Sequence, residues 1–387
     1  MIFQSQLRIP GPTPLPERVV RAMSQPMIDH RGPEFAALLR DVAEGLKKVF
    51  RTGNEMVVLT CSGTGGLESA VANLVSPGER VVAASCGSFG DRFISIIEAY
   101  GTEVVRLEAE WGQPVEPADL ADVLDRHPQA RSVFLTHNET STGLTNPLAQ
   151  LARVAKDARR LVVVDGVSSV SSIPLETDGW GIDVVVSSSQ KGWMSPPGIA
   201  MVSVSDAAWE RHAEARAPRY YLDWAEAKKW AAKGMTPWTP AVSVLYGMRE
   251  GIEIILEEGL EQGWERHRRL ADATAAGLRA AGFTLFAADG YRSATVTSAL
   301  PPDGLDIAAF RKRLRERYGV VIAGGQGKLD GKIIRVGHLG AVAEGDIVQV
   351  LWAIEQVLEE LDSAPADGRA LEAAGRVLAG EVRAALA

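Results

Sequence analysis

The stretch from residue 161 to residue 198 reads LVVVDGVSSVSSIPLETDGWGIDVVVSSSQKGWMSPPG, and it is the most informative part of the chain for predicting the fold. It holds two short apolar runs, at 161–165 and 182–188, with the length and β-branched composition of strands that are buried on both faces. The first run ends at Asp165, and Lys191 follows shortly after the second. The pattern therefore predicts a carboxylate and a lysine at neighbouring strand ends.

Similar runs recur on both sides of this stretch and alternate with helical segments. Such alternation predicts an α/β fold, with a mainly parallel sheet wrapped by helices. Ligands bind such sheets at the carboxyl ends of the strands, which is where Asp165 and Lys191 fall. The other predicted strands are 56–60, 80–85, 132–137 and 199–204, and the predicted helices include 65–75, 91–100, 117–126 and 147–159.

A second unit begins near Gly259. A long helical stretch is followed there by three short apolar runs and a closing helix over 344–361, which is a compact α+β pattern. We therefore expect a large domain over residues 20–258 and a smaller C-terminal domain over 259–387. The alanine-rich end, 363–387, is expected to be a helical extension or a loosely held tail.

Composition argues against several classes of protein. The chain is 46% hydrophobic and carries a formal net charge of −8, with no basic stripe, which argues against nucleic acid as the main partner. The first residues lack the pattern of a signal peptide, and no apolar run approaches the roughly 20 residues that span a bilayer. Cys61 and Cys86 are the only cysteines, so we expect a cytoplasmic protein with no disulfide framework and no metal site.

Asp165 and Lys191 are the residue types that pyridoxal phosphate (PLP) chemistry requires. A lysine condenses with the aldehyde of this cofactor, and a carboxylate keeps the pyridine nitrogen protonated so that the ring can withdraw electrons. Each residue has an ordinary alternative, because Asp at a strand end is commonly a helix N-cap and a lone lysine is commonly a surface charge. Lys191, however, is followed by Gly192, Trp193 and two prolines, a setting in which lysine is poised to lose its proton.

Around these residues the chain resembles the class V, fold type I aminotransferases of the alanine or serine:glyoxylate (serine–pyruvate) group. SSSQKGWMSPPG at 187–198 matches the lysine segment of that family. The similarity extends from GPTPLPERV at 11–19 through HRGPEF at 30–35 to the last long helix. The resemblance implies a seven-stranded, mainly parallel sheet in the large domain, PLP as cofactor, and a homodimer with shared active sites. It also implies that residues 1–19 pack on the dimer partner.

A glycine-rich turn, SGTGGLES at 62–69, follows a predicted strand and opens a helix. Backbone amides at a helix start, with the hydroxyl of Thr64, form an anion site suited to the PLP phosphate. Taken alone, such a turn is more often plain turn geometry, and it is neither the dinucleotide fingerprint nor a Walker loop. The resemblance assigns Thr64, Gly65 and Gly66 to the phosphate, together with Gln190.

Three further side chains are placed around the cofactor ring by the resemblance. Phe89 corresponds to an aromatic residue that stacks on the ring, where many relatives carry Trp or Tyr, although a lone Phe is more often a core residue. Thr140, in HNETSTG at 137–143, would lie near the phenolic oxygen of PLP; its plain alternative is a polar turn. Val167 would cover the opposite face of the ring, and by itself it is simply a buried valine.

Two more assignments rest on the resemblance. MTPWTP at 235–240 matches the segment that reaches across the dimer to the partner's cofactor phosphate, which implicates Thr236 and Thr239; by itself it is a proline-punctuated loop. Arg335, in KIIRVGHLG, matches the arginine that grips the α-carboxylate of the substrate. A guanidinium and a carboxylate form a planar, bidentate pair, although an isolated arginine on a strand is usually a surface charge.

We therefore expect a PLP-dependent transaminase that moves the amino group of alanine or serine to glyoxylate or pyruvate by a ping-pong mechanism. Class V transaminases that act on aspartate, ureidoglycine or aminoethylphosphonate are alternatives, because the substrate pocket is not legible in the sequence. A cysteine desulfurase needs a catalytic cysteine in the second domain, and no cysteine lies beyond Cys86. Some relatives are labelled as a hydrogenase subunit, yet the chain lacks the cysteines of such a metal site. A non-enzymatic binding module would have lost Lys191 or Asp165.

Overall fold

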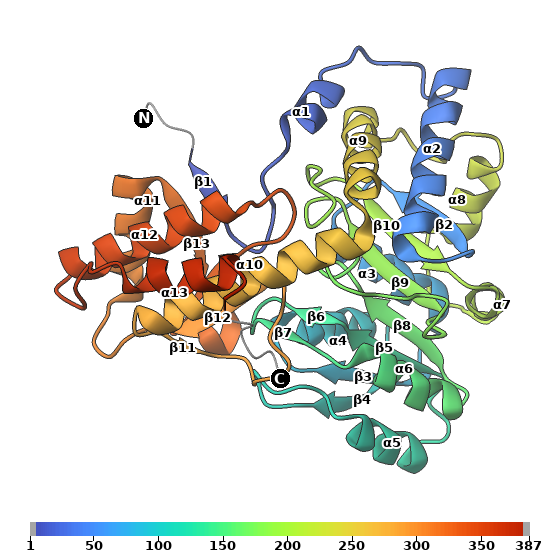
Figure 1. Ribbon diagram of the computed structural model, residues 1–387. Helices are drawn as coiled ribbons and strands as arrows, with labels where there is room; N and C mark the ends of the chain where they lie inside the picture. The colour runs from blue at the N-terminus through green and yellow to red at the C-terminus, as the bar shows by residue number, and fades with distance from the viewer. Residues whose placement is uncertain (1–4, 382–387) are drawn as a thin grey trace.

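A seven-stranded sheet forms the centre of the larger part of the molecule in the computed structural model, which describes residues 5–381 (Figure 1). β10 runs antiparallel to both of its neighbours, and the other neighbouring pairs are parallel. The prediction of a mainly parallel seven-stranded sheet is confirmed. In spatial order the strands are β2 (Glu55–Leu59), β10 (Ala200–Val204), β9 (Val184–Ser188), β8 (Leu161–Asp165), β5 (Ser132–Thr136), β3 (Arg80–Ser85) and β4 (Glu103–Glu108).

Alternate residues of each central strand enter separate hydrophobic cores on the two faces of this sheet. In β8, Val162 and Val164 belong to one core and Val163 to the other. Helices cover both faces, which is why these strands are continuous apolar runs. One face carries α2 (Pro33–Phe50), α5 (Pro117–Arg126), α6 (Leu148–Asp157) and α9 (Val242–Glu258), with α1 (Glu17–Met23) against α9; the other carries α3 (Gly63–Leu74), α4 (Ser88–Ala99), α7 (Asp206–Glu214) and α8 (Trp224–Ala231).

The apolar runs did not indicate β4, and its place in the sheet explains this. It lies at the sheet edge, with β3 as its only partner strand among the described residues. Its sequence EVVRLE leaves Glu103, Arg106 and Glu108 exposed. An edge strand does not need the uniform apolar run of a central parallel strand.

A second, five-stranded sheet lies in the C-terminal part, where α10 extends from the large sheet toward it (Figure 1). Helices α10 to α13 form a third core with one face of this sheet. In spatial order the strands are β1 (Gln6–Arg8), β13 (Val320–Gly324), β14 (Ile334–Gly337), β12 (Val296–Leu300) and β11 (Thr284–Leu285), and the helices are α10 (Leu260–Ala280), α11 (Ile307–Tyr318), α12 (Glu344–Glu360) and α13 (Arg369–Leu378). A hairpin of β6 (Asn138–Glu139) and β7 (Leu144–Thr145) and a 3-10 turn, Gly327–Leu329, complete the described elements.

The two ends of the chain both contribute to this C-terminal part. β1 pairs in parallel with β13, and Arg8 forms an ion pair with Asp346 of α12. The prediction that residues 1–19 pack on a dimer partner stays a prediction, as do the domain boundaries. α13 lies in the alanine-rich end and packs on α10, with Ala370 and Ala374 fully buried, while residues 382–387 lie outside the described residues. None of the helices within residues 5–381 combines the length and apolar character that a membrane-spanning segment needs.

Candidate active site

Asp165 lies at the carboxyl end of β8, near the middle of the large sheet. Its side chain is buried, and its Oδ1 accepts a hydrogen bond from the backbone N–H of Val167 at 2.9 Å. Desolvation raises the pKa of Asp165 to about 6, although the Val167 N–H opposes this shift. A nearby cation stabilises the ionised form of a buried carboxylate, and a protonated pyridine nitrogen is such a cation.

Lys191 lies in the turn after β9, and packing fixes this turn on both sides. Trp193 is fully buried, and its indole N–H donates to Ser187 Oγ at 2.8 Å. Gly192 lies so close to Ser172 that a Cβ at this position would overlap the serine hydroxyl. The turn therefore places the lysine side chain in one direction, beside the end of β8.

The amine of Lys191 is covered by the segment that leads from β1 to α1. Nζ donates to the carbonyl of Pro10 at 2.6 Å. Gly11 has a φ of +134°, and a Cβ there would lie 2.7 Å from Nζ. Desolvation, and then the positive charge of Arg335, lowers the pKa of Lys191 to about 8, with Asp165 opposing the shift. The lowered pKa increases the unprotonated share of this amine near neutral pH, and the unprotonated form can act as a nucleophile or base.

A cavity of about 290 Å³, called here the strand-end cavity, opens between the ends of β8 and β9 and the start of α3. It brings together most of the residues predicted to surround a cofactor. Those that line it are Thr64, Phe89, Asp165, Val167, Gln190 and Lys191.

The start of α3 supplies polar groups to the strand-end cavity. The helix begins at Gly63, and both Gly63 and Thr64 line the cavity. Ser62 caps the helix by accepting a hydrogen bond from the N–H of Gly65 at 3.3 Å. A helix N-terminus, a threonine hydroxyl and the amide of Gln190 together form a donor set suited to a phosphate. The residues present therefore fit PLP, because the polar groups at the start of α3 suit a phosphate and the buried carboxylate suits a protonated ring nitrogen.

Gly66 has a packing role that explains why it is glycine. It does not line the strand-end cavity, and its N–H donates to the Ser62 carbonyl at 3.0 Å within the helix. A Cβ at Gly66 would lie 2.8 Å from the side chain of Val186 in β9 and 2.9 Å from that of Ala200 in β10. The glycine lets α3 approach the sheet closely, so the residue type needs no contact with a phosphate to account for it.

A second cavity, of about 450 Å³, adjoins the first and is called here the small-sheet cavity. Gly11, Phe89 and Lys191 line both cavities, so the lysine stands at their junction. Thr140 and Arg335 line only the second. The structure thus places the predicted carboxylate-binding arginine on the far side of the lysine from Asp165.

The position of Arg335 follows from strand alternation in β14. Ile334 and Val336 point into the core under α10 to α13, so Arg335 points to the opposite face, toward the cavity. Its Nε donates to the Gly324 carbonyl at 2.7 Å and its Nη1 to the Thr140 carbonyl at 2.9 Å. Desolvation lowers the pKa of Arg335 to about 10, so the group still carries its charge at neutral pH.

Glu139 is a site residue that sequence reasoning missed, although it lies inside the quoted motif HNETSTG. Its carboxylate is fully buried and accepts hydrogen bonds from the N–H groups of Phe89 and Gly90, each at 3.0 Å, and from Ser141 Oγ at 2.6 Å. It therefore joins the loop of Phe89 to the turn of Thr140. A charged residue three positions after the end of a buried strand was the available signal.

The two threonines of MTPWTP lie outside both cavities. Neither Thr236 nor Thr239 lines the strand-end or the small-sheet cavity. Thr236 Oγ1 donates to the Trp238 carbonyl at 2.7 Å, and Thr239 is exposed. Their predicted role concerns a partner subunit and stays a prediction.

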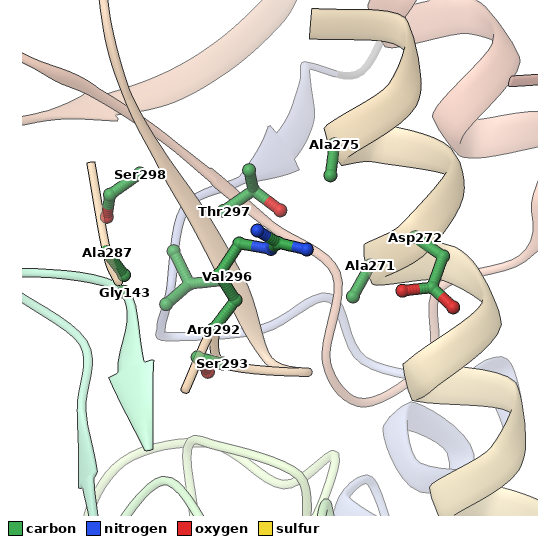
Figure 2. A pocket seen from close by; sticks show the side chains of 10 residues that line it. All are labelled: Gly143, Ala271, Asp272, Ala275, Ala287, Arg292, Ser293, Val296, Thr297 and Ser298. Carbon is green, nitrogen blue, oxygen red and sulfur yellow. The ribbon is translucent and has the colours of Figure 1, made fainter. Parts of the chain in front are cut away.

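A third, much smaller cavity holds none of the predicted residues. It has about 10 Å³, room for roughly one water molecule, and lies between α10 and β12 (Figure 2). Figure 2 shows Asp272 on α10 and the side chain of Arg292 reaching toward that helix. We interpret it as a packing gap between helix and sheet.

Thiol and metal chemistry find no support among the described residues. Burial raises the pKa of Cys61 to about 12 and that of Cys86 to about 12, so both thiols stay protonated at neutral pH. Within residues 5–381 no group of three or more His, Cys, Asp or Glu side chains is placed to hold a metal ion.

A doubly covered sheet with a lysine and a buried carboxylate at its strand ends, and an arginine on the other side of the lysine, suits an enzyme that transfers amino groups. Comparison with known proteins agrees with this class. The family described as Aminotransferase class-V matches residues 7–330. The chain belongs to this family.

Several relatives share nearly the whole length of the chain. A protein of Synechococcus sp. named soluble hydrogenase, small subunit, is 42% identical over 97% of this chain and 98% of its own. The L-aspartate–glyoxylate aminotransferase of Paracoccus denitrificans is 37% identical, covering 93% of each chain. The serine–glyoxylate aminotransferase of Methylorubrum extorquens is 36% identical, covering 92% of this chain and 91% of the relative.

Solved structures show the same fold. The ureidoglycine–glyoxylate aminotransferase of Bacillus subtilis superposes with a TM-score of 0.93, at 30% identity, over 98% of this chain and 99% of that one. The predicted fold type I aminotransferase architecture, with a large α/β part and a smaller C-terminal part, is confirmed.

Proposed function

We propose that the chain is a PLP-dependent transaminase that moves the amino group of a small L-amino acid, alanine or serine, to glyoxylate or pyruvate. The observation that carries the proposal is the position of Lys191 at the junction of two cavities. One cavity has the polar groups that a phosphorylated pyridine needs, and the other has an arginine for a carboxylate. The amine can therefore reach both a cofactor and an amino acid.

The strand-end cavity would hold the cofactor. Asp165 would pair with the pyridine nitrogen, and Thr64, Gln190 and the start of α3 would bind the phosphate. Phe89 and Val167 would enclose the ring, with Thr140 near the phenolic oxygen. When bound, PLP supplies an aldehyde for the amino group and a ring that withdraws electrons.

Residues of the chain perform the positioning and the proton transfer. Arg335 donates two of its guanidinium N–H groups to the carbonyls of Gly324 and Thr140. Its other N–H groups would bind the α-carboxylate of the donor. Nζ of Lys191, with its lowered pKa, removes the proton from the donor Cα. Pro10 and Gly11 cover one side of this amine and fix its position. In the ping-pong order, the oxo acid product leaves before the acceptor binds at the same arginine.

The named relatives support glyoxylate as acceptor and differ in the donor. Glyoxylate appears in the names of the proteins of Paracoccus denitrificans, Methylorubrum extorquens and Bacillus subtilis, with aspartate, serine and ureidoglycine as the respective donors. A pyridoxamine–pyruvate aminotransferase is also similar in structure, which supports pyruvate as a second acceptor. The acceptor is thus better supported than the donor.

We further propose a homodimer in which Thr236 and Thr239 reach the cofactor phosphate of the partner. Tyr220, Tyr221 and Trp238 form an aromatic cluster beside these threonines, and both tyrosine side chains are exposed. Exposed aromatic side chains of this kind are typical of interfaces. The small number of cysteines supports a cytoplasmic enzyme.

The proposal is tested by a half-reaction with the purified, PLP-loaded enzyme. Alanine or serine is added without an acceptor, and the oxo acid released is quantified. We expect close to one equivalent of oxo acid per subunit, then release of glycine when glyoxylate is added. Catalytic release of ammonia instead of one equivalent of oxo acid would contradict transamination.

A further inference from the structure

The small-sheet cavity has a charge pattern that a single carboxylate does not balance. Lys191, Arg311, Arg315 and Arg335 line it, and the lining contains no Asp or Glu. Arg311 and Arg315 are four residues apart on α11, so they share one side of that helix. Within residues 5–381 neither forms an ion pair with a carboxylate.

Arginines on the other side of α11 are paired. Arg313 and Arg317 contact Glu360 of α12 at 3.1 Å and 3.3 Å. Partly buried cations normally have a counter-charge or a ligand, because desolvation without one is costly. Arg311 is partly buried and has no such counter-charge within residues 5–381, which indicates that the cavity beside it takes an anionic ligand.

Arg311 lies directly beside the predicted carboxylate site. Its Nε donates to the Ile322 carbonyl at 3.3 Å, and its guanidinium lies over Gly324, where a Cβ would come within 2.7 Å of Nη1. The carbonyl of Gly324 accepts the hydrogen bond from Nε of Arg335 at 2.7 Å. Two guanidinium groups therefore meet at Gly324, where the missing side chain leaves room for Arg311 and the carbonyl binds Arg335.

We propose that Arg311 binds a second anionic group on the substrate, so that the enzyme accepts amino donors with an acidic side chain. Such a donor would place its α-carboxylate at Arg335 and its distal carboxylate or phosphate at Arg311. Arg315, which is exposed at the rim, adds attraction for the doubly charged molecule. This inference rests on the proposed transaminase function. It adds amino acids with an acidic side chain to alanine and serine as donors.

The reaction balances without an oxidant. The amino group and the Cα hydrogen of the acidic donor are exchanged for the carbonyl oxygen of glyoxylate or pyruvate. The donor becomes the corresponding oxo acid, and the acceptor becomes glycine or alanine. Arg311 takes no part in proton transfer and acts only on which donor is bound.

The test measures kcat/KM of the PLP-loaded enzyme for L-aspartate, L-asparagine and L-alanine with glyoxylate as acceptor. Asparagine has the shape of aspartate without the charge, so we expect aspartate to be preferred over it by about 10-fold or more. Arg311→Gln should lower the aspartate-to-alanine ratio by about 10- to 100-fold, and Arg311→Lys by less, because lysine keeps the charge without the planar fork. L-glutamate and O-phospho-L-serine show which anionic group and length fit best.

Lys312→Gln is the matched control, since it removes the same charge from α11 at an exposed residue that does not line the cavity. The aspartate-to-alanine ratio should keep its wild-type value in this variant. Equal rates with aspartate and asparagine in the wild type would overturn the inference while leaving the transaminase proposal intact, as would an equal loss with aspartate and alanine in Arg311→Gln. No reaction of the wild type with any of these amino acids or with L-serine would overturn both.

Discussion

The two cavities that meet at Lys191 are built in different ways. The strand-end cavity is formed by turns that follow β2, β3, β8 and β9 of one sheet, with the start of the chain as a cover. The small-sheet cavity is formed by the segment after β1, by α11, β13 and β14, and by the turn of Thr140. In the first, most functional residues lie within a few positions of a strand end; in the second, residues far apart in sequence meet only in the folded chain.

Removing the residue that the two cavities share should have the largest effect. Lys191→Ala eliminates the nucleophile and the base, so we expect kcat/KM to fall by about 10⁴-fold. The yellow absorbance of lysine-bound PLP should be lost as well. Steady-state assays with alanine and glyoxylate measure the first effect, with Lys312→Ala as control for the loss of a lysine. A yellow, active variant would contradict the account.

Replacing Asp165 in the strand-end cavity should have the second largest effect, a lower turnover rate. Asp165→Asn keeps the shape and the acceptor for the Val167 N–H but cannot balance a protonated pyridine nitrogen. Loss of one preorganised electrostatic contact in an active site costs roughly 10²- to 10³-fold in kcat. Single-turnover rates with alanine measure this effect, and an unchanged rate would remove Asp165 from its assigned role.

The same substitution should stabilise the protein when PLP is absent. The folded-state pKa of Asp165 is about 6, above its ordinary 3.8, so the folded state binds a proton more readily than the unfolded state between these values. Ionisation therefore destabilises the fold as pH rises through this window, and the penalty is complete above pH 6. We expect Asp165→Asn to be more stable by about 1–3 kcal/mol at pH 7.5, with the gain vanishing below about pH 4. Denaturant titrations at both pH values measure it; a less stable variant at pH 7.5 would refute the assigned cause.

A substitution in the small-sheet cavity should change KM more than kcat. Arg335→Ala should lower kcat/KM for alanine by about 10- to 100-fold, mainly through KM, because a charge-assisted carboxylate contact is lost. Amines without a carboxylate should be affected much less. Equal losses for both kinds of donor would place the carboxylate site elsewhere.

Electrostatic coupling between the cavities is testable through the pH dependence of PLP uptake. An unprotonated Lys191 is needed, so the rate at which the PLP-free protein takes up PLP should rise with pH and level off above about 8. Arg335 lowers the pKa of Lys191, so Arg335→Ala should move the midpoint to higher pH. An unchanged midpoint would show that the two cavities are not coupled by charge.

The sequence predicted the strand-end cavity better than the small-sheet cavity for a physical reason. Asp165, Lys191 and Thr64 stand next to apolar runs or a glycine-rich turn, so local pattern and sheet topology bring them together. Arg311 belongs to the run RKRLRER, where several basic residues look alike. Only packing of α11 on β13 separates the arginine that faces the cavity from those that pair with Glu360.

The N-terminal segment also makes contacts that the local sequence does not predict. GPTPLPERV resembles a family motif, but the sequence does not predict its contact with the lysine. Thr13 accounts for part of this contact, since its N–H donates to the Gln190 carbonyl at 3.0 Å and its Oγ1 to the Lys191 carbonyl at 2.9 Å. Such contacts join residues that are far apart in sequence, and no local period encodes them.

The role of Lys191 can be tested by locating the PLP on the protein. The purified enzyme is loaded with PLP, reduced with borohydride to fix the bond to lysine, digested and mapped by mass spectrometry. A single phosphopyridoxyl group should be found on Lys191, and it should be lost when the donor amino acid is added before reduction. A label on another lysine, or a label on Lys191 that the donor leaves unchanged, would contradict the central claim.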